Sequence, residues 1–346
     1  MDSLQGITLL TIGTILIGVV VFWKASNKSV NTDSAGVKGS GNALSNNSDN
    51  LIKLEREIRD KNFIVIEQII GEINSYPAEK QKIIRDILSD SGVAEHYQAQ
   101  LSDSNSALRA AAAETLGKIR DLKAQEPLFM AMADKNEEVR LAATEALKSL
   151  GDPSIAELLV KSLKDPNRWL PARVAEVLVS LGNGALPALQ DALEDNDPNF
   201  RGYIIEILGE IGIPSSVSAL HRALMDRSVN VRLEAARALG KIGSKESVQP
   251  LIEALGEPEI KVVVQAITSL AKIGGPEVSE HFGEMLEHRD SVVRYTALDA
   301  LSRMGQEGLK IIKKTALIDG HPSAEKAKEI IGEIEGAGAS IKIRYK

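Results

Sequence analysis

The chain has no cysteine among its 346 residues, and aromatic residues make up 3% of it. The absence of cysteine excludes disulfides, thiolate metal ligands, covalent haem attachment and cysteine nucleophiles. It leaves the cellular compartment open, because many exported proteins also lack cysteine. The hydrophobic content of 43% is nevertheless ample for a core. The length fits two ordinary domains or one elongated repeat array.

Positive charge is not in excess. The formal net charge is -7 and the isoelectric point is near 5.5. Proteins that bind nucleic-acid duplexes rely on clustered lysine and arginine side chains. We therefore expect no nucleic-acid partner.

Motifs for catalysis and metal binding are also missing. No serine lies in a G-x-S-x-G context, and Glu137 and Glu138 lie at a helix start, where carboxylates complement the helix dipole. His281, Glu284 and His288 share helical spacing, but a zinc site needs a closed set of three or four ligands, and a solvated helix face accounts for them. We predict a non-enzymatic protein without a metal or cofactor.

A long uncharged segment lies near the N-terminus. From Leu4 to Phe22 no side chain is charged, and Trp23 and Lys24 follow as an interfacial aromatic residue and a cation. A helix of this length spans about 29 Å, close to the hydrocarbon thickness of a bilayer. We predict a single-pass membrane anchor in residues 1–23, with contact to the membrane through residues 4–23. A cleavable signal peptide is the alternative, but the start lacks a basic region.

The flanking charges predict the orientation of this anchor. Asp2 precedes the span, whereas Lys24 and Lys28 follow it. Because lysine and arginine are enriched on the cytoplasmic side, we expect the bulk of the chain in the cytoplasm at the cell membrane. A periplasmic or surface-exposed repeat domain is the alternative. Residues 24–50 are rich in Ser, Asn and Gly and are predicted to form a flexible linker.

One amphipathic helix recurs along the chain. The stretch "VRLEAARALGKIG" at Val231–Gly243 has close copies that begin at Leu108, Val139 and Val293. The copies end in a column with a spacing of 31 residues and one step of 30. The members of this column are Arg120, Gly151, Gly182, Gly212, Gly243, Gly274 and Gly305. A fixed period of this size predicts a solenoid, in which each unit covers the apolar face of its neighbour.

Each unit contains a second helix followed by an acidic or proline-containing turn. Examples are "SIAELLVKSL" ending at Leu163 and the turn "DPN" at Asp165. Aspartate can accept the free backbone N–H groups at a helix start, and proline suits the first helical position. The predicted unit is therefore helix, turn, helix.

The segment "DRSVNVRLEAARALGKIG" at 226–243 resembles HEAT repeats, in particular the short prokaryotic PBS-lyase HEAT-like type. The resemblance covers about residues 77 to 335 and implies an all-α fold, an α-solenoid of about seven two-helix repeats at 101–335. It also implies that the arginine after the first valine pairs with a turn aspartate. Pro171 and Val263 replace this arginine, so those two units should lack the pair.

The ends of the array are atypical. Residues 51–100 contain amphipathic helices that fit the period loosely, and we predict an N-terminal helical cap there. Residues 336–346 alternate isoleucine or tyrosine with lysine or arginine after a glycine-rich stretch. We predict a flexible basic tail, and the alternative is a strand that adds to the sheet of a partner or a hook for anionic lipid.

The resemblance implies that the recurring helix lines a concave groove, and the positions that face it yield two candidate partner-binding features. One is a column of glutamates, and the other is a set of larger side chains of types enriched at binding hot spots. Solvated glutamates, and partial burial of the larger side chains, are the alternatives. The candidate residues are Glu145, Glu176, Glu206, Trp169, Arg173, Tyr203, Leu233, Val264 and Tyr295, with Glu114 in the same column.

We therefore predict a membrane-anchored scaffold or adaptor that binds partner proteins in the groove of the solenoid. The alternative is a phycobilin-lyase-like subunit that acts on a tetrapyrrole and its acceptor protein. The absence of an acid–base constellation and the presence of the anchor count against this alternative.

Overall fold

The computed structural model describes residues 48–344, and these residues contain helices and connecting turns without a strand. Residues from Glu55 onward form one unit. The predicted anchor at 1–23 and the linker up to residue 47 lie outside the described residues. Among residues 48–344, no helix combines the length and the apolar character that crossing a bilayer requires.

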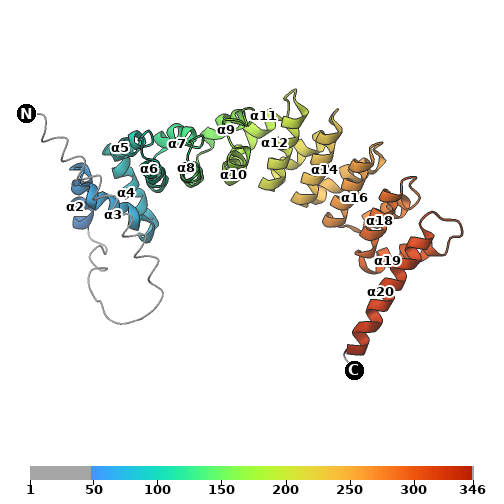
Figure 1. Cartoon of the computed structure of the whole chain (residues 1–346). Helices are drawn as coiled ribbons and strands as arrows, with labels where there is room; N and C mark the ends of the chain where they lie inside the picture. The colour runs from blue at the N-terminus through green and yellow to red at the C-terminus, as the bar shows by residue number, and fades with distance from the viewer. Residues whose placement is uncertain (1–47, 345–346) are drawn as a thin grey trace, which may run out of the picture. The chain divides into compact units, whose positions relative to one another are not determined.

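Seven helices correspond to the recurring sequence and are called the repeated helices. They are α6 (Ser106–Ile119), α8 (Glu137–Leu150), α10 (Pro171–Leu181), α12 (Pro198–Ile211), α14 (Val229–Ile242), α16 (Ile260–Ile273) and α18 (Ser291–Ser302). The companion helices between them are α7 (Gln125–Ala131), α9 (Ala156–Ser162), α11 (Leu186–Ala192), α13 (Val217–Ala223), α15 (Val248–Glu253) and α17 (Pro276–Met285). In Figure 1, α6, α8 and α10 form one row and α7, α9 and α11 form a second row beside it. This arrangement confirms the predicted solenoid of helix pairs.

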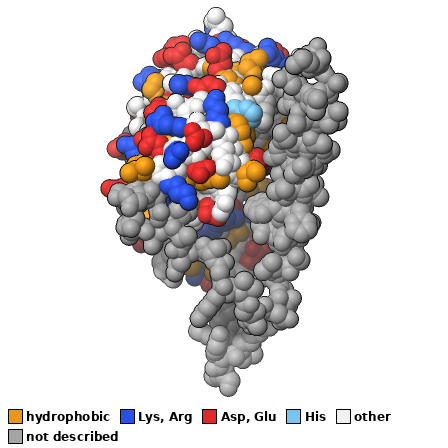
Figure 2. Space-filling view, turned by 90° about the vertical axis from the view of Figure 1, so that its left-hand side faces the viewer, with side chains coloured by type: hydrophobic (Ala, Val, Ile, Leu, Met, Phe, Trp, Pro, Cys, Tyr) orange, Lys and Arg blue, Asp and Glu red, His pale blue; other side chains and the backbone are white. Residues whose placement is uncertain are grey.

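The N-terminal end contains four helices before the first repeated helix. They are α2 (Ser48–Arg59), α3 (Phe63–Glu72), α4 (Ala78–Asp90) and α5 (Val93–Gln100). Helix α5 packs against α6, so the first helix pair of the array already begins inside the range assigned to the cap. Figure 2 views the molecule from this end, where acidic and basic side chains are intermixed with hydrophobic ones.

Small side chains let neighbouring repeated helices approach closely. Ala235 and Ala236 of α14 are fully buried, and Ser269 of α16 donates a hydrogen bond of 2.7 Å from its Oγ to the carbonyl oxygen of Ala236. A Cβ at Gly240 would lie 2.8 Å from the Cα of Ser269. Only glycine therefore fits at this crossing, and the alanine and glycine positions of the repeat serve helix packing.

The glycine column ends helices as expected. Gly151, Gly212 and Gly243 follow α8, α12 and α14 in the left-handed conformation that glycine adopts without a steric penalty. Arg120 takes the same conformation after α6, with φ 59°. The column shifts at Gly305, which begins α19 (Gly305–Ala316) because α18 already ends at Ser302.

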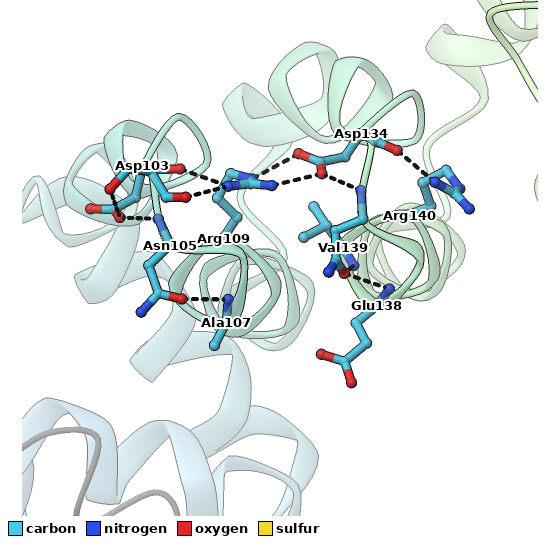
Figure 3. A network of polar contacts seen from close by, with 10 residues as sticks. Asp103, Asn105, Ala107, Arg109, Asp134, Glu138, Val139 and Arg140 are labelled. Atoms are coloured by element: carbon cyan, nitrogen blue, oxygen red, sulfur yellow. Dashed lines mark hydrogen bonds and ion pairs between the residues drawn. The ribbon is translucent and has the colours of Figure 1, made fainter.

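Buried ion pairs connect successive units (Figure 3). Arg109 donates from Nε and Nη2 to the two carboxylate oxygens of Asp134 at 2.7 and 2.8 Å, and its Nη1 donates to the carbonyl oxygen of Asp103. Asp134 also accepts a hydrogen bond from the backbone N–H of Asn136. Arg109 therefore joins the turn of its own unit to the turn of the next, which is the pairing that the repeat implies. The same geometry recurs at Arg201 with Asp226, whereas Nε and Nη2 of Arg232 both contact one oxygen, Oε2, of Glu257.

The ladder of ion pairs is interrupted around α10. Pro171 supplies no guanidinium, as expected, and Lys164 instead pairs with Asp195 of the next turn. Arg140 differs from the expectation, because its Nη2 pairs with Glu137 on its own helix. Helix α10 also has 11 residues, whereas α8 and α12 each have 14. The α9–α10 unit is therefore the least regular part of the described array.

The C-terminal helix corrects the prediction for the tail. Helix α20 runs from Ala324 to Arg344, so residues 336–344 continue a helix instead of forming a flexible or strand-like tail. The physical reason is that α20 packs against α19 and α18, and extending a helix that is already nucleated adds one hydrogen bond per residue. The alternation of apolar and basic residues does not override this extension.

Candidate partner-binding face

The four glutamates of the predicted column lie in the same register on α6, α8, α10 and α12, and all four are exposed. Glu145 pairs with Lys148 at 2.8 Å and Glu176 with Arg173 at 3.5 Å. Within residues 48–344, Glu114 and Glu206 form no ion pair. The column is therefore only partly neutralised by its own helices. The members are Glu114, Glu145, Glu176 and Glu206.

Arg173 connects two repeated helices on this face. Its Nη2 lies 3.1 Å from Oε1 of Glu137 on α8, and its Nη1 lies 3.5 Å from Oε2 of Glu176 on α10. Hydrogen bonds from Arg173 and Arg140 hold the pKa of Glu137 below its usual value. Arg173 is half-buried, so it is a structural bridge as well as a candidate contact.

An apolar stripe crosses three successive repeated helices. Leu233 on α14, Val264 on α16 and Tyr295 on α18 share one register, and these helices pack side by side in this order. Leu233 and Val264 are half-buried, and Tyr295 is 48% exposed. We call these three residues the apolar stripe. Tyr203 on α12 lies one position after the register of the apolar stripe and is half-buried. Burial and the charge of Glu206 raise the pKa of Tyr203.

Trp169 does not face the groove side as expected. It is 6% exposed, and its ring stacks on Phe129 with a centroid distance of 4.1 Å. The guanidinium of Arg168 lies 4.9 Å from the same ring. The reason is that α10 begins only at Pro171, so Trp169 lies in the preceding turn and not on the helix face. The prediction from the register of the glycine column assumed that α10 begins as early as the other repeated helices, and it therefore placed Trp169 on a helix face.

Two exposed apolar residues were missed in the sequence. Leu141 on α8 is 41% exposed and has the same register as the apolar stripe, whereas Val292 is 55% exposed one turn before Tyr295 on α18. The register of Leu141 was a usable signal, because it occupies the column of Leu233 and Val264. Val292 offered no such signal, because its exposure depends on how α18 packs.

The histidines are held by local contacts. His281 Nδ1 lies 3.2 Å from Oε2 of Glu284, and His288 Nδ1 accepts a hydrogen bond from the backbone N–H of Asp290. His288 thus takes the role that aspartate has in the earlier turns. Across the described ranges, no group of three His, Cys, Asp or Glu side chains is arranged to hold a metal ion.

Several solved structures are similar to this chain at low identity. Human deoxyhypusine hydroxylase in complex with glycerol is 20% identical over 73% of this chain and 97% of that chain, with a TM-score of 0.32. The complex of CpcE and CpcF of phycocyanin lyase from Nostoc sp. PCC7120 is 22% identical over 64% and 92%, with a TM-score of 0.30. Importin beta is 15% identical over 77% of this chain and 46% of that chain, with a TM-score of 0.43. No curated protein matches the chain.

The repeat pattern itself matches a known family. HEAT repeats are matched at residues 94–180, 186–269 and 251–320, which together span more than half of the chain. These ranges contain the buried arginine ladder, the close alanine and glycine crossings and the left-handed glycine ends described above. The chain belongs to the HEAT-repeat family.

Proposed function

We propose that this chain is a non-enzymatic scaffold of the PBS-lyase-like HEAT type, which binds a partner protein along its repeated helices and is anchored in a membrane by residues 4–23. HEAT solenoids present extended surfaces that suit protein partners. We expect the repeated helices to line a concave groove, as the resemblance to HEAT repeats implies. The glutamate column would lie along the N-terminal part of this groove and the apolar stripe along its C-terminal part.

The observation that carries the proposal is the exposure of the apolar stripe and its edge. Tyr295 and Val292 are about half exposed one helical turn apart, and Val264 and Leu233 continue the apolar register on the neighbouring helices. Tyrosine is enriched among residues that dominate binding energy, and an exposed apolar patch on a soluble surface marks an interaction site.

The experiment begins with proximity labelling by the full-length chain in membranes, followed by affinity measurement with the partner it identifies. Changing Tyr295 and Val264 to alanine together should weaken the equilibrium affinity by roughly thirtyfold or more through faster dissociation. The matched control is Leu158→Ala on companion helix α9, where the leucine is 38% exposed. Equal weakening by the control, or unchanged affinity of the double variant, would contradict the assignment.

The glutamate column should act mainly on the association rate. Exposed charges farther apart than about 8 Å are screened at physiological salt, so their contribution is long-range steering. Changing Glu145, Glu176 and Glu206 to glutamine should slow association with a basic partner at low salt and leave dissociation nearly unchanged. Association rates that do not depend on these residues or on salt would remove the column from the interface.

The membrane anchor is tested by extraction. The full-length chain should remain with membranes after a carbonate wash, and Leu16→Arg should shift it to the soluble fraction, because a charge at mid-span disfavours insertion by about 3 kcal/mol. A reporter at the C-terminus should be active in the cytoplasm. Salt-extractable full-length chain would refute the anchor, and a tetrapyrrole bound to the purified chain would favour the lyase-like alternative.

A further inference from the structure

Glycine brings the backbones of some successive repeated helices into close contact, and the contact between two successive repeated helices is called a seam. At the α6–α8 seam a Cβ at Gly117 would lie 2.8 Å from the Cα of Ala146. At the α12–α14 seam a Cβ at Gly209 would lie 3.1 Å from the Cα of Ala238. Gly240 has the same position at the α14–α16 seam. The helices at these seams are therefore packed backbone against side chain, without room for movement.

Both seams of α10 lack this glycine. Its position is occupied by Lys148 on α8 and by Val179 on α10. The facing positions hold Val177 and Ile207, both buried, where the glycine seams have alanine or serine. The distance between packed helices depends on the side chains at the contact, and larger side chains hold the axes farther apart. Accordingly, α10 packs less extensively against α8 and α12 than α6 packs against α8.

The ladder of buried ion pairs is interrupted at the same two seams. Arg140 on α8 pairs with Glu137 of its own helix, and Asp165 in the next turn is exposed and forms no ion pair within residues 48–344. Pro171 on α10 carries no charge. Each unit of a repeat array contacts only its neighbours, so the coupling between distant units passes through every seam. Two consecutive weak seams therefore reduce the coupling between the units on either side of α10.

One other seam lacks the buried ion pair. Val263 on α16 carries no charge, so no such pair forms toward α18. The residues at the crossing positions of this seam are Ala271 and Ala300, which are small enough for close approach. Among the repeated helices of residues 48–344, only α10 therefore lacks both the glycine crossing and the buried ion pair at both of its seams.

Partly exposed ion pairs bridge the seams of α10 instead. Nη2 of Arg173 on α10 lies 3.1 Å from Oε1 of Glu137 on α8, and these side chains are 22% and 55% exposed. Lys164 in the turn before α10 pairs with Asp195 in the turn before α12, and the Lys164 side chain is 56% exposed. Water and salt screen such pairs more strongly than the buried pairs of the ladder. The seams of α10 are therefore held by interactions that salt weakens.

We propose that α10 is a hinge in the solenoid, about which the units up to α8 and the units from α12 onward move relative to each other. Hinges lie where a few residues absorb the change between well-packed bodies. The stack of Trp169 on Phe129 keeps the turn before α10 against α7, so the movement separates chiefly the C-terminal ends of the helices. Glu145 and Glu206 lie on opposite sides of α10, so the hinge changes the spacing of the glutamate column. It is a property of the seams and does not depend on which partner binds.

The test measures distances across α10 in the purified full-length chain in neutral detergent. Because the chain has no cysteine, nitroxide labels can be attached at introduced cysteines alone. Ser149, Glu210 and Lys272 are exposed and occupy the same register near the C-terminal ends of α8, α12 and α16. Ser149→Cys with Glu210→Cys spans α10, and Glu210→Cys with Lys272→Cys spans α14 as the matched control. By double electron–electron resonance, the first distance distribution should be about twice as wide as the second, or wider.

The ion pairs make the width of the first distribution sensitive to salt. Raising NaCl from about 0.1 M to about 1 M shortens the Debye length from about 10 Å to about 3 Å. The distribution across α10 should then broaden further, whereas the control distribution should not change. Arg173→Gln should broaden the distribution across α10 at low salt. Arg237→Gln is its control and should change neither distribution, because the partner Glu234 lies on the same helix.

Three outcomes would contradict the proposal. Equal widths for the two label pairs at both salt concentrations would overturn the hinge. Equal broadening of the two distributions by salt would also overturn it, because the whole array would then loosen and not α10 alone. A wide distribution across α10 that responds neither to salt nor to Arg173→Gln would overturn the role of the ion pairs in holding the hinge.

Discussion

The buried pair of Arg201 and Asp226 allows the sharpest test of what holds neighbouring units together. The Arg201 side chain is 4% exposed and the Asp226 side chain 16%. Arg201 donates to both carboxylate oxygens at 2.8 and 2.7 Å and to the carbonyl oxygens of Asp195 and Asn196. Asp226→Asn keeps the shape of the side chain, and its Oδ1 can still accept from the N–H of Ser228. The change therefore removes the charge opposite a buried guanidinium, and it replaces the Oδ2 acceptor of Arg201 Nε with an amide nitrogen that cannot accept.

Removing one partner of a buried ion pair costs roughly 3–5 kcal/mol, because the other charge stays desolvated. We expect a loss of this size for Asp226→Asn, and a smaller one for Glu257→Gln, since Arg232 and Glu257 are 13% and 22% exposed. The control is Glu234→Gln. Its partner Arg237 is 56% exposed, and the change should cost about 0.5 kcal/mol or less.

The assay is urea unfolding of the full-length chain in detergent, followed by circular dichroism. Repeat arrays can unfold in parts. The dependence of the unfolding free energy on urea concentration must therefore be compared among the variants before the unfolding midpoints are converted into free energies. Replacing both partners, Arg201→Met with Asp226→Leu, should be less harmful than Asp226→Asn alone, because no charge is left unpaired. A cost for Asp226→Asn as small as that of Glu234→Gln would show that the pair is solvated and would refute the reasoning.

Three further predictions concern stability. Trp169→Ala should lower the free energy of unfolding in urea by about 3–5 kcal/mol, because the ring is buried on Phe129. Tyr295→Ala should change it by about 0.5 kcal/mol or less. Similar changes for the two variants would contradict the burial of Trp169. The Arg109 hydrogen bond is the main cause that holds the pKa of Asp134 below its ordinary 3.8, and the pKa of Asp226 is also lowered. A carboxyl group whose pKa is lower in the folded state than in the unfolded state stabilises the fold at pH values above the unfolded-state pKa. The melting temperature should therefore fall as the pH drops below about 4, and it should fall less steeply in the Arg109→Met variant. Gly240→Ala should lower the melting temperature, because its Cβ would lie 2.3 Å from Oγ of Ser269. Gly71→Ala in α3 should raise the melting temperature, because its Cβ would meet no atom within 4 Å. The opposite order of melting temperatures would contradict the close crossing at Gly240.

The sequence by itself determined the features that repeat. The column of Gly151, Gly212 and Gly243 ends helices because glycine adopts the left-handed conformation without a Cβ penalty, and this requirement is local. The missing ion pairs at Pro171 and Val263 were also readable, because neither residue carries a charge. The shared register of the four glutamates was readable as well, because it is fixed by the period of the repeat and the pitch of a helix.

Only the tertiary structure decided where the repeat fails. Trp169 fits the periodic count for an exposed site, but the shortened α10 leaves it in a turn, where Phe129 of another helix pair covers its ring. Arg140 has the side chain of the ladder, yet it pairs with Glu137 instead of the next turn, because the turn before α10 departs from the regular geometry. The hydrogen bond from Arg85 to the carbonyl oxygen of Lys118, which is 33 residues away in the sequence, depends on α4 packing at the end of α6. A periodic pattern fixes local conformation and register, but contacts between irregular units depend on helix lengths and packing that no single unit encodes.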